Sequence, residues 1–421
     1  MSKKNDLEHT STTLGSQNMK SSQRMVSVVE PYELPEGWKW CRLPECVSIV
    51  TGKKDANYGT PDGKYLFFTC AEQPLRCDDY SFEGESLLLP GNGANVGQVI
   101  YYDGQFEVYQ RTYVLQKTNE SILLKYLYYH ILGFWKNYNL DKQYGSATNY
   151  IKMGNFLNYH FPLPPTLVEQ QRIVNRIESM FAKLDEAKEK AQNVVDGFET
   201  RKAAILHKAF TGELTANWRK ENGVSDDSWV EKTIGECGKW ERGRSKHRPR
   251  NAPELFGGKY PFIQTGDIAN ADIYIYEHKQ TLSEFGFQQS RLFPKDTLCI
   301  TIAANIGKVA ILTYDCCFPD SVVGFTPFTD VDSKFMYFAI SNIEKDLDSM
   351  APATAQKNLN LKLLTAVKIK LPIFAEQQEI VHILDTILEK ESRAKEAAQT
   401  VLAQIALLKK SILERAFRGK I

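Results

Sequence analysis

The residues best suited to chemistry in this 421-residue chain are the cations of the stretch ERGRSKHRPR, which runs from Glu241 to Arg250. Its candidate contacts are Arg242, Arg244, Lys246, His247, Arg248 and Arg250. Arginine binds phosphate as a charge and reads guanine through two parallel hydrogen bonds, while an intervening glycine lets a backbone approach a duplex. The stretch therefore predicts a contact with DNA, and a solvated basic loop is the alternative.

Other polar side chains are candidates for the same contact. The matching segment TGKKDANYGT, earlier in the chain, supplies Lys53, Lys54, Asn57 and Tyr58. Further clusters supply Arg111, Tyr144, Ser146, Thr148, Asn149, Thr354, Gln356 and Lys357. The clusters around Tyr144 and Thr354 each lie shortly before a proline, in equivalent places, which favours loops that face DNA. A purely structural role remains the alternative for each residue.

One arrangement in the sequence could catalyse a reaction. Asp320 after Pro319, followed by Asp332 and Lys334, loosely fits the carboxylate-lysine pattern with which nucleases hold Mg²⁺ and position water. The sequence contains no phosphate-binding loop, HExxH, GxSxG or amino-methyltransferase motif. Its eight cysteines form no CxxC pair, which favours reduced thiols over a metal site. We therefore predict no catalytic residue and no metal ligand, and keep a self-sufficient DNA nuclease as the alternative function.

The overall composition limits the possible classes of protein. The 52 Lys and Arg residues are balanced by 51 Asp and Glu, so a DNA contact must depend on local patches. Residues 1–30 are polar and lack the apolar segment of a signal peptide, which predicts a disordered leader. No apolar run approaches the roughly 18 residues that cross a bilayer. These features predict a cytoplasmic protein without a membrane contact.

The chain that positions these residues repeats itself. PTLVEQQRIV begins at Pro165 and PIFAEQQEIV at Pro372, and one constant offset relates the two EQQ triplets and the Ala-Phe pairs that follow them. The segments before each copy also match, for example GANVGQVIYY with AANIGKVAILTY, but at drifting offsets. A repeated unit with insertions between fixed points predicts two similar domains that differ in their loops.

After each of these prolines the apolar pattern changes to alternating steps of three and four residues, which is typical of a helix paired with another helix. The expected helix-pair core consists of Ile173, Ile177, Leu184, Phe198, Ile205, Ile380, Leu384, Val401, Ile405 and Ile412. Arg201 interrupts the first apolar stripe and Glu391 the second. A long helix with one apolar stripe needs a partner, so we predict that the two pair antiparallel and that Arg201 contacts Glu391.

The expected fold is α+β, with two similar mostly-β domains separated by two long helices that pair as an intramolecular antiparallel coiled coil in a pseudo-twofold arrangement. The predicted boundaries are 1–30 for the leader, 31–165 for the first domain, 166–214 for the central helix, 215–228 for a linker, 229–371 for the second domain and 372–421 for the C-terminal helix.

The combination of LPEGW, LPP…EQQRIV, KAFTGEL, LPIFAEQQEIV, RAFRGKI and GRSKHRPRN resembles the specificity subunit of type I restriction-modification systems. The resemblance covers residues 31–421 and implies two target recognition domains, each reading one half of a bipartite target in double-stranded DNA. It implies that the helix pair sets the spacer and docks two modification (methyltransferase) subunits. It also implies that this subunit is not an enzyme and holds no cofactor. S-adenosylmethionine would serve the modification subunits, and ATP and Mg²⁺ the restriction subunits that translocate and cut DNA.

Overall fold

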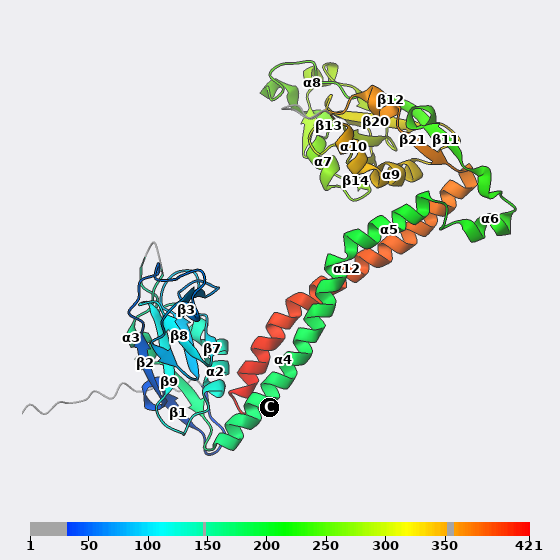
Figure 1. The fold of residues 1–421 in the computed structure, drawn as a ribbon. Coiled ribbons are helices and arrows are strands. Elements are labelled where there is room, and N and C mark those ends of the chain that lie inside the picture. The colour runs from blue at the N-terminus through cyan, green and yellow to red at the C-terminus, as the bar shows by residue number, and fades with distance from the viewer. Residues whose placement is uncertain (1–31, 146–148, 352–357) are drawn as a thin grey trace, which may run out of the picture. The chain divides into compact units, whose positions relative to one another are not determined.

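The computed structural model describes residues 32–145, 149–351 and 358–421. The predicted leader therefore lies outside the described residues. The chain divides into two compact units, one ending at Leu184 and completed by Leu407–Ile421, the other spanning Asp185–Ala406. Each unit holds one domain together with parts of the long helices (Figure 1).

Two sheets and a strand pair form the first domain. Its strands are β1 (Lys39–Arg42), β2 (Val47–Thr51), β3 (Tyr65–Phe68), β4 (Leu75–Cys77), β5 (Phe82–Glu83), β6 (Ser86–Pro90), β7 (Ile100–Tyr102), β8 (Gln105–Val108), β9 (Thr112–Lys117) and β10 (His160–Leu163). The sheets have the orders β2-β9-β6-β7 and β4-β3-β8-β5, and β1 pairs with β10. The helices are α1 (Leu43–Cys46), α2 (Leu124–Tyr138) and α3 (Met153–Leu157).

The second domain repeats this framework with additions. Its strands are β11 (Val230–Thr233), β12 (Gly238–Arg242), β13 (Phe256–Phe262), β14 (Tyr274–Ile275), β15 (Gln280–Leu282), β16 (Leu292–Phe293), β17 (Leu298–Thr301), β18 (Val309–Leu312), β19 (Cys316–Cys317), β20 (Val322–Pro327) and β21 (Lys368–Leu371). The order β12-β20-β17-β18 matches β2-β9-β6-β7, and β15-β13-β19-β16 matches β4-β3-β8-β5. In both domains the central contact of the second sheet, β3 with β8 or β13 with β19, is parallel. The expected internal repeat is therefore present at the level of strand order.

Helices fill the remainder of the second domain and the segments outside both domains. The domain contains α7 (Thr265–Asn270), α8 (Glu284–Gln288), α9 (Ser333–Asn342), α10 (Glu344–Met350), α11 (Leu361–Thr365) and short 3₁₀ turns at Ile234–Cys237 and Pro253–Leu255. The other helices are α4 (Leu167–Asp196), α5 (Phe198–Phe210), α6 (Ala216–Asn222), a 3₁₀ turn at Asp226–Ser228 and α12 (Phe374–Ala416). Among the described residues, no helix is long and apolar enough to cross a membrane.

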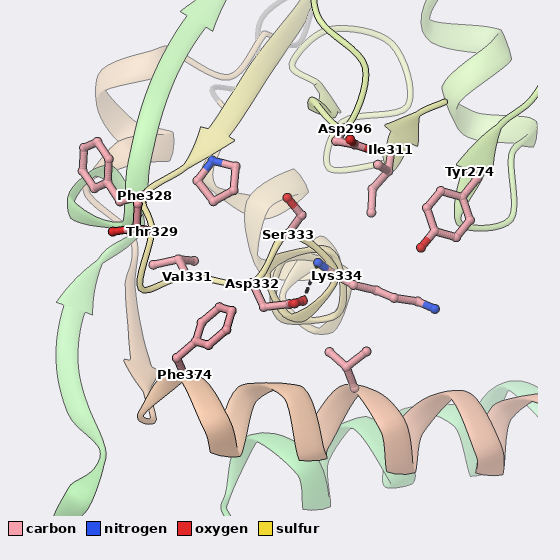
Figure 2. Close-up of a pocket in the computed structure, with 12 residues that line it drawn as sticks. Tyr274, Asp296, Ile311, Phe328, Thr329, Val331, Asp332, Ser333, Lys334 and Phe374 are labelled. Atoms are coloured by element: carbon pink, nitrogen blue, oxygen red, sulfur yellow. Dashed lines mark hydrogen bonds between the residues drawn. The ribbon is translucent and has the colours of Figure 1, made fainter. Parts of the chain in front are cut away.

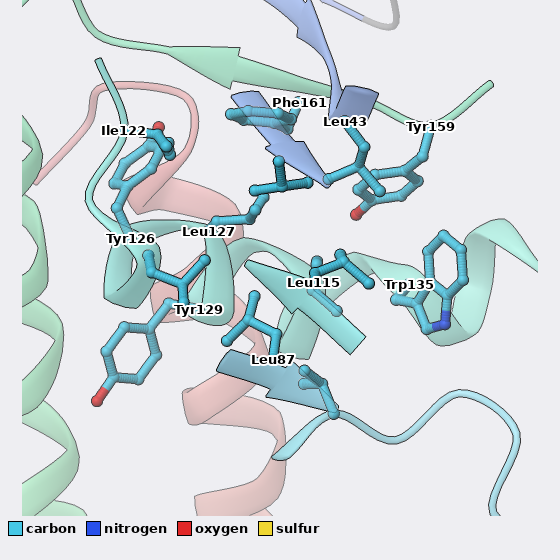
Figure 3. Packing of buried hydrophobic residues seen from close by; sticks show 14 of the residues in the cluster. Leu43, Leu87, Leu115, Ile122, Tyr126, Leu127, Tyr129, Trp135, Tyr159 and Phe161 are labelled. Carbon is cyan, nitrogen blue, oxygen red and sulfur yellow. The ribbon is translucent and has the colours of Figure 1, made fainter. Parts of the chain in front are cut away.

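Apolar residues from the domain and from the long helices share one core in each unit. In the first unit, α2 places Tyr126 and Trp135 against Leu87 and Leu115 of the sheet (Figure 3). Phe417, just after α12, also belongs to this domain core, with its ring 5.1 Å from that of Tyr126. The reason is that the chain leaves α12 at Ala416, which frees the next side chain to enter the domain.

The two long helices pair antiparallel, as predicted. In the second unit, Arg201 Nε lies 2.7 Å from Glu391 Oε2, and Lys395 Nζ lies 4.0 Å from Glu199 Oε1, so positions rise along α5 as they fall along α12 (Figure 1). In the first unit, Lys409 Nζ lies 4.8 Å from the centre of the Phe181 ring. The central helix is interrupted at Gly197, between α4 and α5.

Nine of the ten residues predicted for the helix-pair core are at least partly buried in the structure. Ile173, Ile177, Ile380, Leu384 and Ile405 are buried, while Leu184, Phe198, Ile205 and Ile412 are partly buried. The prediction that Val401 is a core residue is wrong, because its side chain is 39% exposed. Two helices cover only a narrow stripe of each other, and a straight helix of 3.6 residues per turn drifts away from a 3.5-residue pattern. Leu402, one residue further along, is the more buried side chain here.

A buried glutamine attaches each domain to its long helix. Gln170 accepts a hydrogen bond from Leu123 N at 2.8 Å and donates one to Ser121 O at 2.9 Å, immediately before α2. Its counterpart Gln377 accepts from Asp332 N at 2.9 Å and donates to the carbonyls of Asp330 and Pro372, at 3.0 and 2.9 Å. Both side chains are fully buried. The middle residue of each EQQ triplet therefore sets the contact between helix and domain.

The segment predicted as a polar linker is structured. Within it, α6 carries Arg219, whose Nη1 lies 2.6 Å from Glu376 Oε1. The same carboxylate oxygen accepts hydrogen bonds from Thr215 Oγ1 at 2.7 Å and Trp229 Nε1 at 3.0 Å. The Arg219 and Glu376 side chains are only 8% and 0% exposed. Burial of either charge alone would be unfavourable, so the pair holds α6 against the start of α12.

Candidate nucleic-acid interface

The two basic segments found in the sequence occupy equivalent places in the two domains. Residues 52–63, the first basic loop, follow β2, and residues 243–252, the second basic loop, follow β12. Each begins with a glycine, Gly52 or Gly243, where a Cβ would collide with the carbonyl oxygen of Val108 or Pro319. Only glycine fits where backbones cross this closely. The loops therefore leave the shared framework at the same point.

The carboxylate of Asp320 organises one side of the second basic loop. Arg250 Nη2 lies 2.8 Å from Asp320 Oδ2, and Arg242 Nε donates a hydrogen bond to the Asp320 carbonyl oxygen. Arg248 Nη1 donates to the carbonyl oxygens of Ser245 and His247, each at 2.8 Å. These three arginines are thus held by the protein itself. Asp320 was not predicted to have this role, and no cation lies near it in the sequence to indicate one.

Two cations of the second basic loop remain available. Arg244 is half-buried and Lys246 is exposed, and among the described residues neither side chain has an ion pair or hydrogen bond. The backbone N–H groups of Arg244 and Lys246 donate hydrogen bonds to Phe318 O at 3.1 Å and Gln289 O at 3.3 Å. These bonds hold the loop backbone in place at both residues. A fixed backbone with unpaired cations is suited to phosphate, because little ordering is needed on binding.

The first basic loop carries fewer available charges. Lys54 Nζ lies 3.9 Å from the centre of the Tyr58 ring, and the Tyr58 hydroxyl donates to Asp79 Oδ2 at 2.8 Å. The neighbouring Tyr58 hydroxyl raises the pKa of Lys54, which keeps this lysine charged. Lys53 and Asn57 are exposed. The loop therefore offers one cation against an aromatic ring, one exposed cation and one exposed amide.

The third group of predicted residues meets at the turn formed by residues 91–93 of the first domain. Gly91 N donates to the carbonyl of Arg111 at 2.8 Å, and Gly93 N donates to that of Asn149 at 2.8 Å. Arg111 and Asn149 are exposed, and the Tyr144 ring, 44% exposed, stacks on Tyr150. The structure brings these three residues to one region. The predicted Ser146, Thr148, Thr354, Gln356 and Lys357 lie outside the described residues.

The residues of the nuclease alternative have structural partners instead. Asp332 Oδ1 accepts hydrogen bonds from the backbone N–H groups of Lys334 and Phe335, at 2.8 and 2.9 Å, and so caps α9. Lys334 Nζ lies 2.7 Å from Asp385 Oδ2 of α12. Figure 2 shows Asp332 turned back onto its helix and the Lys334 side chain extended away from it. Both residues line an open hollow of about 490 Å³. Asp320 is engaged with Arg250, so the three residues form no catalytic arrangement.

Comparison with known proteins agrees with this geometry. The family model described as "Type I restriction modification DNA specificity domain" matches residues 35–195 and again 226–401, which together span most of the chain. Each match contains one domain and part of the long helix that follows it. The chain belongs to this family.

Known specificity subunits are similar to this chain over most of its length. The type I restriction enzyme EcoDI specificity subunit of Escherichia coli is 28% identical over 92% of this chain and 90% of its own. A putative type I restriction enzyme MjaX specificity subunit of Methanocaldococcus jannaschii is 23% identical over 78% of this chain and 76% of its own. The HsdS subunit of Thermoanaerobacter tengcongensis shares the fold, with a TM-score of 0.65 over 93% of this chain and 99% of its own, at 20% identity.

These findings identify the chain as a specificity subunit of a type I restriction-modification system, with two target recognition domains. Such subunits are the non-catalytic DNA recognition components of their complexes. These comparisons give no support to the nuclease alternative. The carboxylate-lysine match arose because Asp332, Lys334 and Asp320 are common residues with separate structural tasks.

Proposed function

We propose that each target recognition domain reads one half of a bipartite DNA target, and that the helix pair fixes the spacer between the halves. The domains would comprise residues 31–165 and 229–371, with residues 166–214 and 372–421 forming the helices. The observation that carries this proposal is one strand framework used twice, with loops of different charge leaving it at the same point. Equal frameworks with unequal loops suit two different half-sites.

In this proposal, the basic loops make the DNA contacts. Arg244 and Lys246 would bind phosphates and position the second domain, because no protein group among the described residues neutralises them. Arg242, Arg248 and Arg250, held in fixed directions, would face the base edges. Lys53, Lys54, Asn57, Tyr58, Arg111, Tyr144 and Asn149 would serve the first domain. His247, Ser146, Thr148, Thr354, Gln356 and Lys357 complete the proposed contact set.

The partners follow from the family. The assembly would contain two modification subunits, which use S-adenosylmethionine, and restriction subunits, which use ATP and Mg²⁺. This subunit would need no cofactor of its own. The complex would act on DNA in the cytoplasm. Exposed apolar side chains on the long helices support a docking role for them. Val168 of α4 is 81% exposed and Leu407 of α12 is 69% exposed.

The proposal is tested in the complex assembled with its modification subunits. Arg244→Ala combined with Lys246→Ala should weaken DNA binding at low salt for target and random sequences alike. It should also reduce the slope of log affinity against log salt by about 1.8, at roughly 0.9 per phosphate contact. Lys220→Ala combined with Lys345→Ala removes two exposed lysines of the same unit, outside the loop, and is the matched control. Equal slopes for the two double variants would refute the phosphate assignment.

Sequencing that detects methylated adenine tests the larger claim. Host DNA should carry a split, asymmetric methylated motif only when this gene and its modification partner are both present. Replacing residues 229–371 with the second domain of another specificity subunit should change one half of the motif and leave the other half and the spacer unchanged. A change in both halves would contradict the assignment of one half-site to each domain.

A further inference from the structure

Two thiols of the first recognition domain lie in direct contact. Cys41 on β1 and Cys46 at the end of α1 have sulfur atoms 3.1 Å apart, within hydrogen-bond distance. The extended backbone of Arg42 followed by the four-residue helix α1 turns the chain back and brings the two together. Each residue is 2% exposed. Among the described residues, none of the eight cysteines takes part in a disulfide.

The surroundings make the two thiols unequal. The hydrogen bond from Cys41 lowers the pKa of the Cys46 thiol to about 7, and the same contact raises the pKa of Cys41. Cys41 Sγ also lies 3.4 Å from Glu45 Oε2, whose side chain is 46% exposed, so the pair lies only one side chain below the surface. A thiolate next to a second thiol is the arrangement that reacts with small oxidants.

The second domain lacks this arrangement although its backbone matches. β11 pairs with β21 as β1 pairs with β10, and the third residue of β11 is Lys232 where β1 has Cys41. Cys237 ends the following turn, as Cys46 ends α1, but within the described parts of the chain its sulfur makes a hydrogen bond to the Thr233 carbonyl alone, at 3.5 Å. Burial raises the pKa of Cys237 to about 11. The paired thiols are therefore a property of the first domain.

We propose that Cys41 and Cys46 form a redox-active dithiol that a hydroperoxide converts to an intramolecular disulfide. The Cys46 thiolate attacks a peroxide oxygen, the O–O bond breaks, and a sulfenic acid forms with release of hydroxide. Cys41 sulfur then attacks the sulfenic sulfur, the S–S bond forms and water leaves. The two thiols lose two electrons and two protons in total, and hydrogen peroxide is reduced to two waters.

Little movement is needed for this reaction. A disulfide requires a sulfur separation of about 2.05 Å, so the atoms must approach by about 1 Å. The bond would join β1 to the end of α1, next to β10, whose chain continues into α4. Oxidation would thus act where the first recognition domain connects to its long helix.

Peroxide treatment of the full folded chain tests the proposal. After quenching, unfolding and alkylation, mass spectrometry without reduction should find a Cys41–Cys46 linked peptide that has lost two hydrogens. Cys70, which is partly exposed and lies 3.5 Å or more from its polar neighbours, is the internal reference. The linked peptide should form before Cys70 is oxidised. The opposite order, with Cys41 and Cys46 still alkylated when Cys70 is consumed, would overturn the proposal.

Two substitutions separate the hydrogen bond from the second sulfur. Cys41→Ser keeps a donor but cannot form a disulfide, so Cys46 should accumulate as a sulfenic acid that dimedone traps. Cys41→Ala also removes the donor, and oxidation of Cys46 at pH 7.5 should slow by roughly tenfold because less thiolate is present. Equal rates in the two variants would refute Cys41 as the cause of the reactivity. Hydrogen exchange of both variants shows whether the domain remains folded.

Discussion

Replacement of Gln377 by leucine should selectively weaken the attachment of the second recognition domain to α12. Leucine has a similar volume, so the main loss is the three hydrogen bonds to Asp332 N, Asp330 O and Pro372 O. At a net value of about 0.5–1.5 kcal/mol for each bond, the free energy of local unfolding should fall by about 2–4 kcal/mol. Gln377 is fully buried, so water cannot replace these bonds without opening the joint.

Native-state hydrogen exchange measures this loss where it occurs. Amides at the start of α9, next to Asp332, should exchange about 30-fold to 700-fold faster in Gln377→Leu, at 1.4 kcal/mol for each factor of ten. The neighbouring Gln378→Leu changes an exposed side chain and should stay within about 0.5 kcal/mol of the unaltered protein. Gln170→Leu should produce the corresponding loss at the start of α2. If Gln377→Leu and Gln378→Leu changed the hydrogen-exchange rates at the start of α9 equally, the buried side-chain amide of Gln377 could not be what attaches the domain to α12.

Three further predictions concern charged groups. Asp320→Asn should raise the affinity of the assembled complex for random-sequence DNA several-fold and lower its preference for the target, because Asp320 both repels phosphate and orients Arg250. Competition binding measures this effect. A parallel loss of affinity for target and random DNA would indicate a structural role alone. Burial lowers the pKa of His130 to about 3 from an ordinary 6.5, so its contribution to stability is complete above pH 6.5 and is lost as the pH falls towards 3. Urea unfolding should show about 2 kcal/mol of this loss by pH 5, and His130→Asn should have a correspondingly shallower pH dependence. In a double-mutant cycle on unfolding free energy, Arg201→Ala and Glu391→Ala should show a coupling energy of about 0.5–1 kcal/mol. High salt should remove it, because these side chains are 38% and 25% exposed. A coupling energy of zero at low salt would mean that the ion pair contributes nothing to stability.

The helix pair was the part most accessible to sequence reasoning. Apolar spacing determines which face of a helix is buried. Arg201 and Glu391 interrupt the two apolar stripes at positions that lie side by side only when the helices pair antiparallel. The error at Val401 has the same origin, since periodicity gives the stripe but not its width. The exact repeat also indicated two similar domains, which the matching strand orders confirm.

Contacts between distant segments could not be predicted in this way. Asp320 and Arg250 are neighbours only because β19 and β20 return the chain beneath the second basic loop. The polar composition of residues 215–228 suggested a linker, but the buried partner Glu376 of Arg219 belongs to a helix far along the chain. Gln170 and Gln377 did carry a signal, since both occur in the repeated triplet, but their neighbours in the fold were needed to assign a role.

The partners of the two buried glutamines are all backbone atoms: N–H of Leu123 and Asp332, and carbonyls of Ser121, Asp330 and Pro372. A joint of this kind does not depend on which side chains the recognition domain carries at those positions. Mutation can therefore alter a domain extensively, loops and sheet surfaces included, while the peptide groups that meet the helix stay the same. Because of these backbone contacts, the residues that read the DNA target can change while the attachment of the domain to its helix is kept.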